Sequence, residues 1–213
     1  MSKKKLGLDD AYAVETPADN IELYRDWAET YDSDFAAPRG YVYPARIAAI
    51  YSQLASAYHQ PILDVGAGTG LVAEALTAHT SAPIDGIDIS QEMLDVSETK
   101  GLYRQLVCAD LTGNLDIASH SYGAIVSAGT FTLGHVGPEA LYKLLHIAKP
   151  GALFVIGING VAFDKYGFGS TIATLSADGL ITDLNFYHTQ YYDNAEDEHA
   201  GDQGLTACFH TAS

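Results

Sequence analysis

The fold of this chain is decided by residues 61–70, which read PILDVGAGTG. A short apolar strand over residues 61–65 ends in a glycine-rich turn over residues 66–70, and a helical pattern over residues 71–76 follows directly. Glycine tolerates positive φ angles and lets a ligand lie against the backbone where a β-carbon would clash. We therefore expect a ligand-binding turn at the carboxyl end of a parallel strand, where open α/β sheets bind their ligands.

Strand-like and helical segments alternate outward from this turn. Further strands are predicted at residues 84–89, 105–108, 122–127, 152–158, 181–192 and 205–211, and helices at residues 91–99, 138–148 and 170–180. The last two strands are joined without a helix, so they should be antiparallel. The pattern predicts an α/β fold with a seven-stranded, mainly parallel sheet, helices on both faces and an antiparallel last strand.

The length of 213 residues suits a single domain, and no internal repeat is visible. Residues 1–17 carry no convincing period and are predicted to be a flexible tail. Residues 18–57 contain two helical patterns and no strand, and we interpret them as a helical lid. Residues 58–213 are predicted to form the core of the domain.

The charge of the chain disfavours a nucleic-acid partner. There are 27 acidic and 11 basic side chains, giving a formal net charge of −16, and the only basic cluster is Lys3, Lys4 and Lys5. Nucleic-acid binding requires clustered lysine and arginine that neutralise phosphates. No apolar run approaches the ~20 residues of a membrane span, and no signal peptide is evident.

The cysteines and histidines argue against a disulfide framework and a metal site. Cys108 and Cys208 lie far apart without CxxC spacing, and their apolar contexts predict buried, reduced thiols. The eight histidines show no metal-ligand spacing, so no metal is expected. These features together predict a cytoplasmic protein that does not bind membranes.

An acidic residue after the second strand indicates the kind of ligand. Asp88 lies eighteen residues beyond Gly70, where its carboxylate is placed to accept hydrogen bonds from a ribose diol. The alternative is a capping role for the following helix. Dinucleotide sites have the spacing GxGxxG, whereas this turn has GxGxG with Leu71 in the expected place of the third glycine. Asp64 suits a ligand that carries ammonium and sulfonium groups, which favours S-adenosylmethionine.

Several segments resemble class I S-adenosylmethionine-dependent methyltransferases. Residues 62–70 look like the first motif of that family, and residues 86–90 with the following Met93-Leu94 look like the second. The likeness continues in residues 108–111, in the fourth-strand segment 124–130 and in the Lys149-Pro150-Gly151 turn. The resemblance implies a Rossmann-like fold and S-adenosyl-L-methionine as the cofactor. Residues 129–140 look closest to the Williams–Beuren region methyltransferase-like proteins.

The resemblance also implies which residues bind the cofactor. In the family, the residue that matches Asp110 meets the adenine amino group and the next residue packs against the ring; a turn-forming role for Asp110 is the alternative. The lid tyrosine Tyr31 matches a position that reaches the methionine end of the cofactor, although a purely structural aromatic stripe with Tyr24 and Trp27 is the alternative. The expected cofactor-binding set is Tyr31, Asp64, Gly66, Gly68, Asp88, Ile89, Met93, Asp110, Leu111 and Ser127.

Methyl transfer by in-line displacement depends mainly on alignment of the acceptor with the methyl group. A hydroxyl or ammonium acceptor also needs a general base, for which histidine is suited. His135 follows the fourth strand and is our candidate catalytic residue; the alternative is a structural residue at the start of a helix. The [DN]-P-P-[YF] sequence of enzymes that methylate base or amide nitrogens is replaced by Ser127-Ala128-Gly129-Thr130, which favours a small-molecule acceptor.

Two other functions stay open on the sequence alone. A nicotinamide-dependent oxidoreductase would use the same glycine turn with a dinucleotide. A non-catalytic S-adenosylmethionine-binding protein would keep the turn and Asp88 without turnover. The acceptor, the methylated atom and the oligomeric state are not fixed by these residues.

Overall fold

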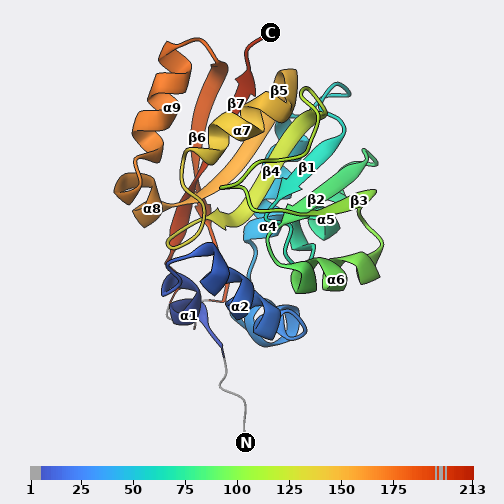
Figure 1. Ribbon diagram of the computed structural model, residues 1–213, viewed down its shortest axis with the longest axis vertical. Helices are drawn as coiled ribbons and strands as arrows, with labels where there is room; N and C mark the ends of the chain where they lie inside the picture. The colour runs from blue at the N-terminus through green and yellow to red at the C-terminus, as the bar shows by residue number, and fades with distance from the viewer. Residues whose placement is uncertain (1–5, 195, 197–198, 200) are drawn as a thin grey trace, which may run out of the picture.

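The computed structural model describes residues 6–194, 196, 199 and 201–213, so the Lys3–Lys5 cluster lies outside the described residues. One seven-stranded sheet, in the order β3-β2-β1-β4-β5-β7-β6, forms the centre of the molecule (Figure 1). Its strands are β1 (Ile62–Val65), β2 (Ile84–Asp88), β3 (Gln105–Cys108), β4 (Tyr122–Phe131), β5 (Ala148–Asn159), β6 (Ile181–Gln190) and β7 (Gln203–Thr211). The predicted fold class is confirmed.

The strand directions follow the prediction. β1 pairs in parallel with both β2 and β4, and β4 pairs in parallel with β5. β7 runs antiparallel to β5 on one side and to β6 on the other. The strand order changes direction between β1 and β4, because the chain adds β2 and β3 on one side of β1 and β4 on the other. Such a reversal leaves a crevice beyond the carboxyl ends of the two central strands.

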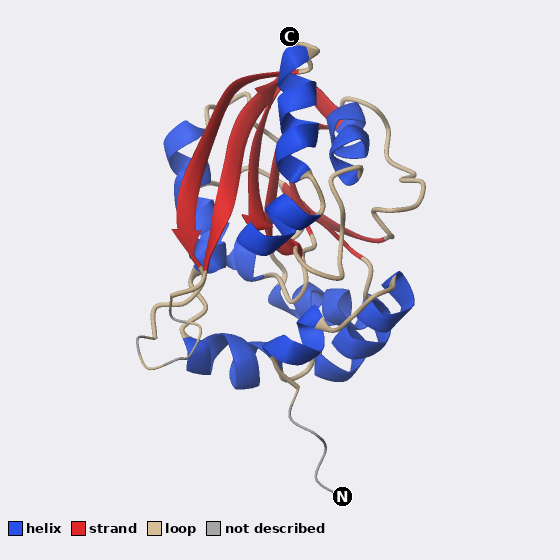
Figure 2. Cartoon of the chain, turned by 90° about the vertical axis from the view of Figure 1, so that its left-hand side faces the viewer, coloured by secondary structure: helices blue, strands red, loops and turns tan. Residues whose placement is uncertain are grey.

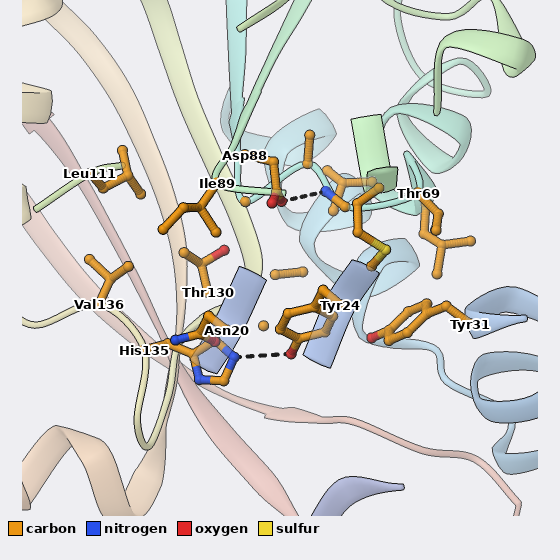
Figure 3. A pocket seen from close by; sticks show the side chains of 18 of the residues that line it. Asn20, Tyr24, Tyr31, Thr69, Asp88, Ile89, Leu111, Thr130, His135 and Val136 are labelled. Carbon is orange, nitrogen blue, oxygen red and sulfur yellow. Dashed lines mark hydrogen bonds between the residues drawn. The ribbon is translucent and has the colours of Figure 1, made fainter. Parts of the chain in front are cut away.

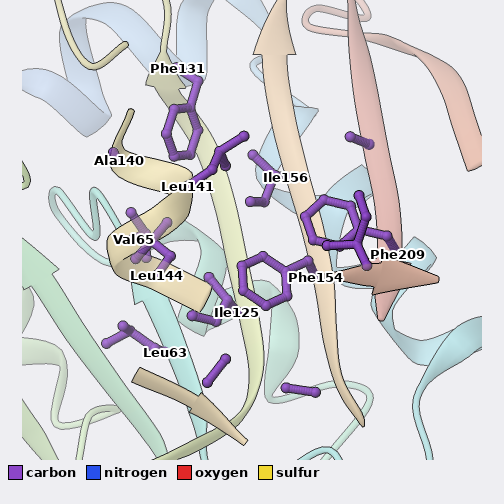
Figure 4. Packing of buried hydrophobic residues seen from close by; sticks show 14 of the residues in the cluster. Leu63, Val65, Ile125, Phe131, Ala140, Leu141, Leu144, Phe154, Ile156 and Phe209 are labelled. Carbon is purple, nitrogen blue, oxygen red and sulfur yellow. The ribbon is translucent and has the colours of Figure 1, made fainter. Parts of the chain in front are cut away.

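Helices cover both faces of the sheet, which is why the central strands are apolar on both sides. The side chains of β1 alternate: Leu63 and Val65 belong to the core beneath α7 and α9, and Ile62 belongs to the core beneath α4 and α5. Figure 4 shows the first of these cores, with Leu144 of α7 against the strands. The bounds are α4 (Tyr43–Leu54), α5 (Leu71–Leu76), α6 (Gln91–Lys100), α7 (Ala140–Ile147), α8 (Gly160–Lys165) and α9 (Phe168–Ala177).

The N-terminal helices lie together at one end of the sheet (Figure 2). They comprise α1 (Leu8–Tyr12), α2 (Pro17–Trp27), the π-helical segment η1 (Tyr31–Ala36) and α3 (Ala37–Arg39). We call these four segments the lid. Among the described residues, no helix has the length and apolar character that a membrane crossing requires.

Three expectations about chain organisation need correction. Residues 8–17 are not a tail, because Leu8, Ala11 and Val14 are buried, and Leu8 and Ala11 pack in the same core as α4. Residues 43–54 are not part of a lid, because α4 packs on the sheet. Cys108 is exposed rather than buried, since β3 is the edge strand, whereas Cys208 is buried and both thiols are free.

We expect Leu144→Ala to lower the free energy of unfolding by about 2–5 kcal/mol, because the Leu144 side chain is completely buried and its removal leaves a cavity. Tyr142 of the same helix is 47% exposed, so Tyr142→Ala should change that free energy by no more than about 0.5 kcal/mol. Urea denaturation of both variants tests this packing, and equal effects would contradict it.

Candidate functional site

A cavity lies where the carboxyl ends of β1, β2, β3 and β4 face the lid. The empty space between its walls, including its opening to solvent, is about 950 Å³. One wall is formed by segments that follow the strands, and the other by Asn20 and Tyr24 of α2 and by Tyr31 of η1. Figure 3 shows side chains from both walls pointing toward the same space.

The glycine turn after β1 is held in a conformation that other residues adopt with strain. Gly66 and Gly68 have φ angles of +69° and +52°, in the left-handed region. A β-carbon on Gly66 would lie 1.7 Å from Oγ1 of Thr130, so this position accepts only glycine. The Gly66 and Ala67 N–H groups donate to the Ile87 carbonyl at 2.8 and 3.0 Å. The turn is therefore fixed against the end of β2.

Asp88 connects this turn to the next helix. Its Oδ2 accepts a hydrogen bond from the Gly68 N–H at 2.8 Å, and its Oδ1 accepts one from the Ser90 N–H at 2.9 Å. Burial raises the pKa of the Asp88 carboxyl, and the N–H bonds from Ser90 and Gly68 oppose that rise. A carboxylate has about four lone-pair sites, so Asp88 keeps capacity for ligand hydroxyls while supporting the start of α6.

Four further predicted residues line the cavity beside Asp88. They are Ile89, Met93, Asp110 and Leu111. Asp110 also makes the local turn, because its Oδ1 accepts a hydrogen bond from the Thr112 N–H at 2.7 Å. The side chains of Ile89 and Leu111 give this part of the cavity two apolar walls (Figure 3).

Two predicted residues do not reach the cavity. The Ser127 side chain is completely buried and donates to the Val65 carbonyl at 2.7 Å, so it joins β4 to β1. The Asp64 side chain is also completely buried and accepts a hydrogen bond from the Tyr103 hydroxyl at 2.6 Å. Neither lines the cavity, because these side chains are enclosed within the sheet and its covering layer. The cofactor-binding role predicted for Asp64 and Ser127 therefore stays a prediction, without support from the lining of the cavity.

Burial also changes the acidity of Asp64. The loss of hydration, opposed by the hydrogen bond from Tyr103, raises the pKa of Asp64 to about 7. Oδ1 of this carboxyl has no hydrogen-bond partner. An ionised Asp64 is therefore poorly stabilised in the folded protein.

The lid is tied directly to the glycine turn. Asp32 of η1 accepts a hydrogen bond from the Thr69 hydroxyl at 2.6 Å and forms an ion pair with the Lys100 ammonium at 2.8 Å. Tyr31, the residue before Asp32, lines the cavity as expected. The centroid of its ring lies 5.1 Å from the ring centroids of both Trp27 and Phe35, so the aromatic packing of the lid also positions Tyr31.

His135 lies on the cavity wall and contacts the lid. Its Nδ1 is 2.8 Å from the Leu133 carbonyl, and its Nε2 is 3.0 Å from the Tyr24 hydroxyl, as the dashed line in Figure 3 shows. Burial lowers the pKa of His135 below its ordinary value, and the bond to Leu133 opposes this only partly. The imidazole is therefore neutral near pH 7. The bond to the Leu133 carbonyl agrees with a structural role of His135. Its position on the cavity wall agrees with a catalytic role.

Sequence reasoning missed several residues of the cavity. Asn20 and Tyr41 line it but carry no recognisable motif, and Thr130 and Val136 line it from segments that resemble the family without having been singled out. Tyr24 was visible only as a member of an aromatic stripe, and its contact with His135 spans 111 residues of sequence. Among the described residues, no group of His, Cys, Asp and Glu side chains is arranged to hold a metal ion.

Comparison with known proteins assigns the class. Residues 62–151 match a family described as a methyltransferase domain, and this range contains the glycine turn, Asp88 and His135. Residues 62–151 thus form a methyltransferase domain, and the fold is that of the class I S-adenosylmethionine-dependent methyltransferases.

The similar proteins include one curated relative from Homo sapiens, methyltransferase-like protein 27. It is 32% identical over 150 residues, which cover 67% of this chain and 59% of the human protein. The chain thus spans about three fifths of the length of that relative.

Solved structures share the fold. A SAM-dependent methyltransferase from Aquifex aeolicus is 15% identical with a TM-score of 0.61, over 87% of this chain and 97% of that one. The [4+2]-cyclase SpnF is 16% identical with a TM-score of 0.67, over 93% of this chain and 97% of that one. At these identities the likeness shows the fold alone.

We expect Ser127→Ala to lower the free energy of unfolding by about 1 kcal/mol, the low end for a lost buried hydrogen bond. The loss is limited because the Thr130 hydroxyl donates to the same Val65 carbonyl at 2.9 Å. Affinity for S-adenosylhomocysteine, measured by calorimetry, should stay unchanged. A tenfold weaker affinity would show that Ser127 contacts the cofactor after all.

Asp64 should make the cofactor-free protein less stable as pH rises. Its pKa is about 7 in the folded protein and 3.8 as an ordinary carboxyl, so the folded state binds the proton more tightly. The contribution of Asp64 to the stability of the folded protein is complete below about pH 4 and is lost as pH rises through about 7. Asp64→Asn should therefore gain stability relative to the wild type between pH 5 and 8. A stability difference that does not vary with pH, in denaturation curves across this range, would contradict the assignment.

Proposed function

We propose that this chain transfers a methyl group from S-adenosyl-L-methionine to a small-molecule acceptor. The observation that supports this most is one cavity bounded by the glycine turn, Asp88 and the His135–Tyr24 pair. The glycine turn and Asp88 suit an adenosyl group, and the His135–Tyr24 pair suits an acceptor that must lose a proton. When bound, the cofactor supplies a methyl group on a sulfonium, which is an electrophile with a good leaving group.

The residues present fit that cofactor. Asp88, Ile89 and Leu111 line the cavity, where Asp88 would accept hydrogen bonds from the ribose hydroxyls and the two apolar side chains would flank the adenine ring. A β-carbon added at Gly68 would meet the Met93 methyl group at 3.6 Å and the Gly66 carbonyl oxygen at 4.0 Å, and no other atom beyond the neighbouring residues of the chain. A ligand can therefore approach the backbone here. Tyr31 closes the cavity from the lid and would help to exclude water from the methionine end.

The same cavity fits a nicotinamide dinucleotide less well. Leu71 occupies the position of the third glycine, and its side chain lines the cavity at the start of α5. A pyrophosphate normally lies against that helix start with glycine at this position.

A small acceptor and a cytoplasmic location are parts of this proposal. The lid closes over the cavity through the Asp32–Thr69 bond, which supports an acceptor small enough to be enclosed. The acidic chain is poorly suited to nucleic acid. Two free cysteines are compatible with a reducing compartment.

We expect Asp88→Ala to weaken S-adenosylhomocysteine binding by about 1–3 kcal/mol, because ribose hydroxyls would lose their acceptor. Asp95→Ala, on the exposed side of α6, serves as the control and should bind normally. Calorimetry gives the affinities, and a thermal melt of each variant checks that it is folded. Normal binding by folded Asp88→Ala would remove Asp88 from the site.

Catalysis needs its own measurement, because one solved protein of this fold is named a [4+2]-cyclase. Radiolabelled S-adenosylmethionine should transfer label to small molecules of a fractionated cell extract. Cofactor binding without label transfer to any fraction would favour a non-catalytic binder. Binding of NAD in place of S-adenosylhomocysteine would favour an oxidoreductase.

A further inference from the structure

A second chamber adjoins the cofactor cavity beneath the lid. Its empty volume, including its opening, is about 550 Å³, and it shares His135 and Tyr24 with the first cavity. Its walls are mainly aromatic, with rings from the lid, from the start of α4 and from the residues that follow β6. They include Tyr12, Trp27, Phe35, Tyr43, Tyr191 and Tyr192.

The chamber is aromatic without being charged. Among the described residues that line it, there is no aspartate, glutamate, lysine or arginine. Aromatic rings bind another ring through stacked or edge-to-face contacts, which favours a planar occupant. An ammonium group in the chamber would have no carboxylate among these lining residues to pair with. The chamber therefore suits an uncharged aromatic molecule.

The polar atoms near the junction of the two cavities can accept hydrogen bonds. The Asn20 amide donates from Nδ2 to the Gly134 carbonyl at 3.0 Å and to the Thr16 carbonyl at 3.3 Å, which fixes its orientation. Its Oδ1 is consequently an acceptor, and that atom is buried without a partner. An unsatisfied buried acceptor is unfavourable, so a ligand that donates a hydrogen bond there would be favoured.

Tyr24 and His135 extend this set of acceptors. Because the Leu133 carbonyl cannot donate, the His135 proton lies on Nδ1, and Nε2 accepts from the Tyr24 hydroxyl. The Tyr24 oxygen keeps free lone pairs on a residue that lines both cavities. A proton accepted by Tyr24 can thus be passed to a neutral imidazole.

We propose, on the basis of the proposed methyl-transfer function, that the aromatic chamber binds a neutral phenol whose hydroxyl points toward Tyr24. The phenol O–H donates its proton to the Tyr24 oxygen, and the Tyr24 proton moves to Nε2 of His135. The phenol becomes a phenolate and His135 an imidazolium, so the net charge of the complex is unchanged. The Leu133 carbonyl stabilises the imidazolium through Nδ1–H.

Trp27 is the only tryptophan of the chain and lines the chamber, so its fluorescence reports an occupant directly. We expect 3-nitrophenol to quench it saturably at neutral pH in cofactor-free protein. The methyl ether 3-nitroanisole, which has the same ring without a donor, should bind about tenfold more weakly, equivalent to about 1.4 kcal/mol. The cation phenethylammonium should bind more weakly than 3-nitrophenol. Equal or tighter binding of either comparison molecule would overturn the proposal.

Tyr24→Phe tests the hydroxyl while keeping the ring. It should weaken 3-nitrophenol about tenfold and leave 3-nitroanisole unchanged. Tyr58→Phe, at a side chain that is 87% exposed, should change neither affinity. If Tyr24→Phe binds 3-nitrophenol like the wild type, Tyr24 does not receive the hydroxyl and the proposal fails.

A parallel titration with S-adenosylhomocysteine separates this inference from the proposed function. Binding of S-adenosylhomocysteine without binding of 3-nitrophenol would overturn the phenol proposal alone. Failure to bind S-adenosylhomocysteine would instead contradict the proposed function, on which the phenol proposal rests.

Discussion

The hydrogen bond between the Gly68 N–H and the Asp88 carboxylate is the interaction on which the site depends. It joins the turn after β1 to the end of β2, and the positive φ angles of Gly66 and Gly68 make that turn possible. Because β1 and β2 are neighbours in a parallel sheet, this bond places one half-buried carboxylate beside the half-buried backbone of the glycine turn. The proposed adenosyl site follows from this geometry, and the lid and the proposed acceptor chamber lie beside it.

The lid contributes chemistry as well as cover. Its polar contact, between Asp32 and Thr69, fixes it to the glycine turn, and its aromatic packing places Tyr31 over the cavity. Asn20 and Tyr24 of α2 then face His135, which comes from the loop after β4 (Figure 3). The cofactor would be held mainly by the sheet side of the cavity. The acceptor would be held mainly by side chains that the lid brings to it.

The sequence predicted those parts of the structure that local patterns determine. The run from residue 61 to residue 76 predicted β1, the turn and α5, because apolar strand and glycine signals lie next to each other in the chain. The position of Asp88 at the end of β2 was predicted for the same reason. The motif gave the positions of Asp64 and Ser127 along their strands but not the direction of their side chains, which are buried and do not line the cavity.

Long-range packing explains the other differences. The helix α1 is only five residues long and too short to be stable alone, so its helical state depends on burial of Leu8 and Ala11. The contact of Tyr24 with His135 likewise exists only once the lid has docked. Neither feature has a local sequence signal.

The most direct measurement of the central claim is a crystal structure of the chain with S-adenosylhomocysteine. We expect the ribose hydroxyls to lie within hydrogen-bond distance of the Asp88 carboxylate, with the adenine between Ile89 and Leu111. An adenosyl group bound elsewhere, or with its ribose turned away from Asp88, would contradict the central claim.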